Sequence, residues 1–363
     1  MASSSPPVRG RATPRSPAAR SSTPRASMVD VARLAGVSGQ TVSRVANGSL
    51  NVSPETRRRV LDAMESLGYS PNTAARALRS GSFETIGVIA HRLARTGESR
   101  TVEAVARAAR EAGHTVTLLD LDSTEHADVA EAASRLSHQA IDGLIIIRAE
   151  IEDADRLLLP TGLPVVVQDA TFGGRLPMIG SDHAGGARLA VEHLLSLGHR
   201  TVHHVAGPAD SIPARARLTA WREVLAEHGI AAPEPVQGDW TAESGHAAGI
   251  AIADRPDITA VFCANDEMAT GLMLACHERG RRIPEDLSVV GFDDVPLAAF
   301  LSPPLTTVRQ PFARVGARLV EEVLARIETG RGPRGGTGEE PVEPAELIPC
   351  ELVVRRSTRA PRP

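Results

Sequence analysis

The stretch Ser38–Asn47, S-G-Q-T-V-S-R-V-A-N, most constrains what this chain can fold into. Ser38 is a favoured residue at a helix N-cap, because its hydroxyl can accept a hydrogen bond from an otherwise unpaired backbone N–H. Val42, Val45 and Ala46 then fall on one face at helical spacing. The pattern predicts a short helix that buries this face.

The opposite face of the predicted helix carries long planar side chains, those of Gln40, Arg44 and Asn47. In the major groove an arginine can bind guanine through two hydrogen bonds, and a glutamine can do the same for adenine. We therefore expect this face to contact the base edges of double-stranded DNA.

The residues before this stretch predict another helix and a tight turn. Ser27 and Asp30 fit a capping box at the start of a helix through Val29–Ala35. Gly36-Val37 then forms a short turn, which gives a helix-turn-helix. The alternative, a helical hairpin in a larger core, does not require three polar side chains to share one face. The apolar stripe of the first helix is Val31, Leu34 and Ala35.

A third helix completes this N-terminal part. Ser53 can cap a helix that has Pro54 at its favoured first position and Gly68 at its end. Three short helices make a headpiece of roughly 45 residues, a size that needs support from DNA or a partner. The apolar stripe of the third helix is Val60, Leu61, Met64 and Leu67.

The segment Pro71–Ser80 lies between two predicted folded units. It is polar and alanine-rich, and Leu78 is its only large apolar side chain. A helix this short is marginal in water. The segment is therefore either a hinge that folds on a partner or a plain linker whose leucine packs on the body.

Charge divides the chain into a basic end and an acidic remainder. The first 80 residues hold twelve arginines and four acidic residues, whereas the whole chain has a formal net charge of -4. Such an asymmetry is expected where only the basic end meets a polyanion. Residues 1–26, rich in Ser, Pro, Ala and Arg, are expected to be a disordered tail. This tail either adds attraction to phosphates or is an inert extension.

From Glu84 onward, runs of Val, Ile and Leu such as Thr85–Ala90 alternate with helical stretches, and the pattern restarts near Gly186. This alternation is typical of parallel sheets covered by helices on both faces. Two such series predict two α/β lobes with a ligand cleft beyond the carboxyl ends of the strands. Glu346–Val354 is predicted to be a last strand, followed by a short basic tail.

Polar residues follow several of these strands, among them Asp169, Asn265 and Asp293. Their short side chains can form paired hydrogen bonds with vicinal hydroxyl groups, which Arg217 can also bridge, and Trp240 can stack on a pyranose ring. Each residue also has a structural alternative, because Asn or Asp after a strand is often a cap or turn. The residues alone leave both interpretations open.

No catalytic motif stands out in the body. The chain has no Walker loop, no G-x-G-x-x-G, no nucleophile elbow and no H-E-x-x-H. We therefore expect no enzyme activity and no cofactor. His203 and His204 are adjacent on a predicted strand, so their side chains point to opposite faces. Together with nearby His199 they therefore do not indicate a metal site.

Targeting features are equally sparse. The chain has no 18-residue apolar run and no secretory signal, so we expect a cytoplasmic protein without membrane contact. Cys263, Cys276 and Cys350 are odd in number and far apart, which argues for reduced thiols.

The run Asp30–Gly48, D-V-A-R-L-A-G-V-S-G-Q-T-V-S-R-V-A-N-G, resembles the DNA-binding headpiece of the lactose/galactose repressor family. Four runs resemble the family's effector domain, namely Ser181–Arg200, Ala264–Ala269, Val289–Asp294 and Ser302–Gln310. The resemblance implies a two-lobed, periplasmic-binding-protein-like effector domain and a homodimer on a pseudo-palindromic operator. It also implies a hinge helix that folds on DNA and inserts Leu78 into the minor groove.

The resemblance assigns roles to individual residues. The implied DNA contacts are Ser38, Gly39, Gln40, Thr41, Ser43, Arg44, Asn47, Asn51, Asn72, Ala75 and Leu78. The implied effector contacts are His91, Asp169, Arg217, Trp240, Asn265, Asp293 and Gln310.

The expected boundaries follow from the same resemblance. They are a tail at 1–26, a headpiece at 27–70, a hinge at 71–82, an effector and dimerisation domain at 83–356, and a tail at 357–363. Within the effector domain, the first lobe is expected at about 84–181 and 311–334, and the second at about 182–310 and 344–356.

We thus expect a cytoplasmic, dimeric repressor of carbohydrate-utilisation genes that a small molecule controls. The resemblance at Trp221 and Gly238–Trp240 implies a sugar, such as a galactoside. His91, Arg92 and Arg95 stand where small hydroxyl residues occur in relatives, which favours an anionic or larger glycoside. The alternatives are a transport-type sugar-binding protein without a DNA role, a sugar-processing enzyme and a purine-responsive repressor.

Overall fold

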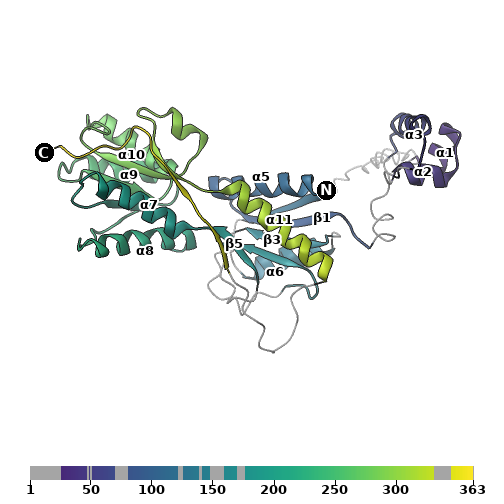
Figure 1. Cartoon of the computed structure of the whole chain (residues 1–363), viewed down its shortest axis with the longest axis horizontal. Helices are drawn as coiled ribbons and strands as arrows, with labels where there is room; N and C mark the ends of the chain where they lie inside the picture. The colour runs from purple at the N-terminus through teal and green to yellow at the C-terminus, as the bar shows by residue number, and fades with distance from the viewer. Residues whose placement is uncertain are drawn as a thin grey trace, which may run out of the picture. The chain divides into compact units, whose positions relative to one another are not determined.

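The computed structural model describes residues 26–46, 49, 51–69, 81–121, 126–138, 141–147, 159–169, 176–330 and 345–362. The chain divides into two compact units that meet in sequence at residues 79 and 80 (Figure 1). The first unit contains the headpiece and the second contains the α/β body.

Among the described residues of the first unit, the helices are α1 (Met28–Ala35), α2 (Gly39–Ala46) and α3 (Pro54–Ser66). The three predicted N-caps are confirmed, because Ser27, Ser38 and Ser53 each accept a hydrogen bond from the backbone N–H three residues later. Gly36 has a φ of 64°, which residues with a side chain rarely adopt, and so allows the sharp turn between α1 and α2.

The core of this unit differs from the predicted stripes at two positions. Leu34 and Leu61 are 56% and 50% exposed, and Ala32 and Ala63 are buried instead. Residues three, four and seven apart share a helix face. In α1 this face runs through positions 28, 31, 32 and 35, and in α3 through 60, 63, 64 and 67, so both leucines fall outside it. The two leucine predictions were therefore wrong.

In the part of the chain that the structure describes, the second unit holds two six-stranded sheets, in the orders β11-β5-β4-β3-β1-β2 and β12-β10-β9-β8-β6-β7. The first sheet consists of β1 (Thr85–His91), β2 (Thr115–Leu121), β3 (Gly143–Ile147), β4 (Val165–Gln168), β5 (Met178–Ser181) and β11 (Ala345–Ile348). The second consists of β6 (His203–Ala206), β7 (Val236–Gln237), β8 (Ala260–Cys263), β9 (Ser288–Asp293), β10 (Thr306–Arg309) and β12 (Glu351–Val353). Parallel pairing within both sheets confirms the predicted pair of α/β lobes.

Helices cover both faces of each sheet (Figure 1). On the first sheet, α5 (Thr96–Glu111) and α11 (Phe312–Thr329) pack on one face and α6 (His126–His138) on the other. On the second, α7 (His183–Ser196) and α8 (Ile212–Glu227) lie opposite α9 (Ala242–Ala253) and α10 (Asp266–Glu278). None of the helices formed by the described residues is long and apolar enough to cross a membrane.

The predicted last strand, Glu346–Val354, is in fact two strands that belong to different lobes. β11 pairs with β5 in the first sheet, whereas β12 pairs antiparallel with β10 in the second. Pro349 lies between them and cannot continue a ladder, because it has no backbone N–H. The assignment of 344–356 to the second lobe was therefore wrong for 345–348. The chain crosses between the lobes here, as it does between β5 and α7 and between β10 and α11.

The expected C-terminal tail is, over its described residues, packed on the second lobe. Ser357 is fully buried, and its Oγ donates to the carbonyl of Val289 at 2.6 Å and accepts from Thr306 N at 2.8 Å. Val289 N in turn donates to the Ser357 carbonyl at 2.9 Å. These bonds mostly involve the backbone, which explains why an apolar pattern in the sequence does not reveal them.

We expect Ser357→Ala to lower the free energy of unfolding by about 1–3 kcal/mol, because a buried N–H and a buried carbonyl each lose a partner. Urea denaturation measures the change. Ser196→Ala is the matched control, because the exposed Ser196 hydroxyl bonds only to the His193 carbonyl within α7. Equal midpoints for the two variants would contradict a structural role for the C-terminal segment.

His204 on β6 predicts a loss of stability in acid. Its ring stacks on Phe262 at 4.8 Å between centroids, and its Nδ1 donates to the Phe262 carbonyl at 2.9 Å. Burial lowers the pKa of His204 from 6.5 to about 4. The unfolded chain therefore binds this proton at a higher pH than the folded chain, and the free energy of unfolding should fall by about 3 kcal/mol as the pH drops from 6.5 to 4.

Denaturation at a series of pH values tests this prediction. His204→Phe should flatten most of the pH dependence while it keeps an aromatic ring against Phe262. Burial also lowers the pKa of His193, His199 and His203, so a smaller slope of the same sign should remain. An unchanged slope in the variant would count against His204 as the main source.

Candidate DNA-binding face and effector cleft

Helix α2 presents the predicted base-contacting side chains. Gln40 and Arg44 are exposed, whereas Val42 and Val45 on the other face are buried in the core of the first unit. Ser38 Oγ also lies 2.9 Å from the hydroxyl of Thr41, which ties the first turn of the helix together. One face of α2 is thus anchored and the other is open, as a recognition helix in the major groove requires.

The other predicted DNA contacts differ in exposure, and some of them lie outside the described residues. Gly39 is exposed, and an added Cβ there would meet nothing within 4 Å, so no steric reason requires glycine. Ser43 is half-buried and Asn51 is exposed. The remaining predicted contacts, Asn47, Asn72, Ala75 and Leu78, lie outside the described residues.

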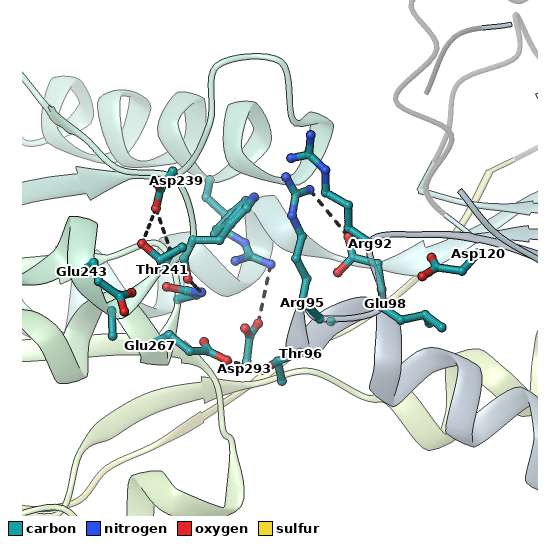
Figure 2. A pocket seen from close by; sticks show the side chains of 17 residues that line it. Arg92, Arg95, Thr96, Glu98, Asp120, Asp239, Thr241, Glu243, Glu267 and Asp293 are labelled. Atoms are coloured by element: carbon teal, nitrogen blue, oxygen red, sulfur yellow. Dashed lines mark hydrogen bonds and ion pairs between the residues drawn. The ribbon is translucent and has the colours of Figure 1, made fainter. Parts of the chain in front are cut away.

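A cleft of about 630 Å³ is lined by both lobes of the second unit (Figure 2). The first lobe contributes Arg92, Arg95, Thr96, Glu98 and Asp120 among others. The second lobe contributes Arg217, Trp240, Asn265, Glu267 and Asp293 among others. The volume is in the range of small-molecule sites, and four of the seven predicted effector contacts line it.

The backbone around the cleft is locally strained. Arg92, Trp240 and Asp293 line the cleft and have φ values of 52°, 77° and 118°. Asp169, which follows β4, has a φ of 55°. Residues with a side chain rarely adopt such values, which cost free energy and tend to cluster at functional sites.

Arg217 from α8 is the buried centre of the second lobe's wall. Its Nη2 lies 3.8 Å from Asp293 Oδ1 and 3.2 Å from His183 Nδ1, and its Nη1 donates to the carbonyl of Ala264. Its Cζ stands 3.7 Å from the centroid of the Phe292 ring. The guanidinium is therefore charge-balanced and fixed in orientation, which suits it to bind hydroxyl groups in a defined direction.

Trp240 and Asn265 have structural as well as cleft-lining positions. Asn265 caps α10 by accepting from Met268 N at 2.9 Å, and its Nδ2 donates to the Trp240 carbonyl at 2.9 Å. The Trp240 ring occupies the space that a Cβ at Gly207 would need, at 2.5 Å. The cap alternative for Asn265 is thus confirmed, and these contacts hold both residues in place at the cleft.

The other three predicted effector contacts are not among the described residues that line the cleft. Gln310 Nε2 donates to Asp293 Oδ1 at 2.6 Å, and Asp169 Oδ2 lies 3.3 Å from His183 Nε2. Gln310 and Asp169 therefore hold Asp293 and His183, the two side chains that contact Arg217. His91 is buried at the end of β1. Direct contact of these three residues with an effector stays a prediction.

Sequence reasoning missed several polar side chains at or near the cleft. Glu98 is fully buried and lies 3.8 Å from Arg95, so it balances a charge on which the expectation of an anionic effector rested. Glu267 and His183 were also missed. Glu98 and Glu267 stand in the first turns of helices, a favoured place for acidic residues, so the sequence alone gives no sign that they face a cleft.

Asp266 explains why glycine occupies position 291, within the run Val289–Asp294. Its wholly buried carboxyl accepts from Thr307 Oγ1 at 2.5 Å and from Val295 N at 2.8 Å. Burial and the nearby carboxylate of Asp293 raise its pKa well above the usual value. A Cβ at Gly291 would stand 2.2 Å from Asp266 Oδ1, so only glycine fits there without a shift.

Fold and site together define a helix-turn-helix protein with a two-lobed body and a cleft of the size of small-molecule sites. The family model for bacterial regulatory proteins of the lacI family matches residues 27–72, and that for a periplasmic binding protein-like domain matches 191–358. The chain is 35% identical to the lactose operon repressor of Escherichia coli K12 over 338 residues, which is 92% of this chain and 91% of the relative. The chain therefore belongs to the lacI family of bacterial regulatory proteins, and it is a DNA-binding regulator of transcription.

Other relatives are similar over the same length. The repressor PurR of Photobacterium profundum is 32% identical over 344 residues, which is 92% of this chain and 99% of that protein. A solved structure of the lac repressor dimer bound to operator and the anti-inducer ONPF has a TM-score of 0.79 and 34% identity, covering 92% of this chain and 99% of that one. A CelR–cellobiose complex has a TM-score of 0.65 and 33% identity, covering 92% and 100%.

Proposed function

We propose that this chain is a cytoplasmic repressor that binds a pseudo-palindromic operator as a homodimer and responds to a saccharide in the cleft. Helix α2 would enter the major groove at each half-site, and the segment 71–82 would form the hinge in the minor groove. The chain acts by binding and not by catalysis. Operator binding by the lac repressor dimer and cellobiose binding by CelR, the two structural relatives, support this proposal.

The observation that carries the saccharide proposal is the arrangement around Arg217. A fixed guanidinium, the carboxylate of Asp293 and the amide of Asn265 line one wall together with the indole of Trp240. Vicinal hydroxyl groups can pair with the charged and amide groups, while an aromatic ring can cover the apolar face of a pyranose. Each group is also anchored by contacts of its own, so the site is preorganised.

The proposed switch requires the saccharide to bind two arrangements of the lobes with different affinity. A change in how the lobes of the dimer face each other would decide whether the hinge segments fold on DNA. The three crossings between the lobes are the segments that would bend. Hinges are commonly short connections of this kind at the ends of elements.

Three measurements test the proposal. An operator is first selected from random duplexes with the purified protein, and its affinity is measured by fluorescence anisotropy against random competitor. A thermal-shift screen of mono- and disaccharides then identifies ligands, and each hit is added to the operator complex. We expect operator preference and a change in it with at least one saccharide. A protein with no duplex preference, with or without small molecules, would contradict the proposal.

A nucleobase is the second candidate effector. The Trp240 indole and the Arg217 guanidinium that line the cleft can also stack on and hydrogen-bond to a planar base. Adenine, guanine and hypoxanthine therefore belong in the same screen. Stabilisation by a base and by no saccharide would replace the saccharide proposal and leave the DNA-binding proposal unchanged.

A further inference from the structure

Glu267 joins the two lobes across the cleft. It is the second residue of α10 in the second lobe, and Thr96 is the first residue of α5 in the first lobe. The Thr96 hydroxyl donates to Glu267 Oε1 (Figure 2). A second cavity, of about 630 Å³, also has Thr96 and Glu267 in its lining, so this pair stands between two open spaces.

Two polar atoms of the cleft lining have no hydrogen-bond partner among the described residues. One is the other carboxylate oxygen of Glu267, Oε2, and the second is the indole Nε1 of Trp240, whose side chain is more than nine-tenths buried. A buried polar atom without a partner costs free energy unless something else satisfies it. The cleft thus offers one acceptor and one donor to a ligand that carries both, as a hydroxyl group does.

The charges of the cleft restrict that ligand further. Six carboxylates line the cleft, those of Glu98, Asp120, Asp239, Glu243, Glu267 and Asp293, against three arginines. Arg95 and Arg217 each lie 3.8 Å from one of these acids, Glu98 and Asp293. The described lining then holds one further arginine, Arg92, and four further carboxylates, and like charges placed together oppose binding.

We propose that Glu267 is a specificity-determining residue of the effector site. Its Oε2 accepts a hydrogen bond from a hydroxyl group of an uncharged effector while its Oε1 holds Thr96. The Glu267 carboxylate therefore joins ligand binding to closure of the lobes. It also disfavours effectors that carry an acidic group next to Oε2. The inference rests on the proposed function for the identity of the ligand, but the contact between the lobes is independent of it.

The first test compares matched ligands. Galactose, lactose, cellobiose and ribose are each paired with an acidic counterpart: galacturonate, lactobionate, cellobionate and ribose 5-phosphate. Binding to the wild-type dimer and to Glu267→Gln is measured by calorimetry. For each pair of ligands that binds, we expect the dissociation constant of the acidic member to exceed that of the neutral member by about tenfold or more in wild type. Glu267→Gln should reduce this ratio of dissociation constants about tenfold. Acidic members that bind as well as the neutral ones, or a ratio that Glu267→Gln leaves unchanged, would overturn the proposal.

The second test needs no ligand. Thr96→Val removes the hydroxyl with little change in volume, and Thr96→Ser keeps it as the matched control. Hydrogen exchange of the first turns of α5 and α10 should be about tenfold faster in Thr96→Val than in wild type and unchanged in Thr96→Ser. Equal exchange in the two variants would overturn the coupling role of Glu267. If no saccharide binds wild type, the proposed function fails, and the exchange experiment still decides whether Thr96 and Glu267 join the lobes.

Discussion

Asp293→Asn should abolish the response to the effector while the apo protein still binds its operator. Asp293 is almost fully buried, lies 3.8 Å from Arg217 and accepts from Gln310 at 2.6 Å. Asparagine keeps the acceptor and tolerates the positive φ of this position, so the variant removes mainly the charge. Removing one partner of a buried charged pair costs enough to weaken saccharide binding about 100-fold.

Calorimetry with the saccharide found in the screen measures the affinity, and fluorescence anisotropy measures operator binding. Asp254→Asn is the matched control, because its exposed carboxylate pairs with Arg279 away from the cleft lining. We expect the control to bind saccharide and operator like wild type. A normal response to saccharide in Asp293→Asn would remove this residue from the effector site.

Arg44→Ala should remove most of the operator preference and leave weak, salt-sensitive binding to any duplex. Arg44 is exposed on the polar face of α2, which Val42 and Val45 anchor in the core. A bidentate arginine–guanine contact is worth about 1–3 kcal/mol. The proposed dimer would lose two of them, so affinity for the operator should fall about 100-fold or more while affinity for phosphates remains.

A competition experiment with the selected operator and random duplex measures this change. Arg59→Ala is the matched control, because Arg59 is an exposed arginine of the same unit on α3. Removing a charge there should weaken binding to both duplexes equally. If Arg44→Ala also lowered both affinities by the same factor, Arg44 would be a phosphate contact and not a base contact.

The parts of the fold that depend on neighbouring residues could be predicted from the sequence. The caps at Ser27, Ser38 and Ser53 were found because a cap needs only a hydroxyl and the backbone three residues later. β5, β7 and β10 were not predicted as strands. β7 spans only residues 236–237, and β5 (M-I-G-S) and β10 (T-T-V-R) lack the unbroken apolar run that marks the equally short β4 (V-V-V-Q).

The site was predictable to a similar degree. Asn265 and Asp293 were found because residues after parallel strands meet at one edge of a sheet. Glu98, His183 and Glu267 could not be found in this way. Glu98 and Glu267 line the cleft, and His183 contacts Arg217, only because of tertiary packing that no local pattern encodes. The pairing of Glu98 with Arg95 is different, because the two residues lie three positions apart at the start of α5, and a local pattern could have revealed it.

The placement of β11 in the first sheet has a consequence for synthesis. The first lobe needs residues 345–348 for its edge strand and α11 for one of its faces, so the ribosome makes the second lobe from α7 to β10 before the first lobe can be completed. The headpiece leaves the exit tunnel long before that point. A nascent or prematurely terminated chain that ends before residue 345 therefore contains helix α2 but lacks a complete first lobe, and so lacks a complete effector cleft.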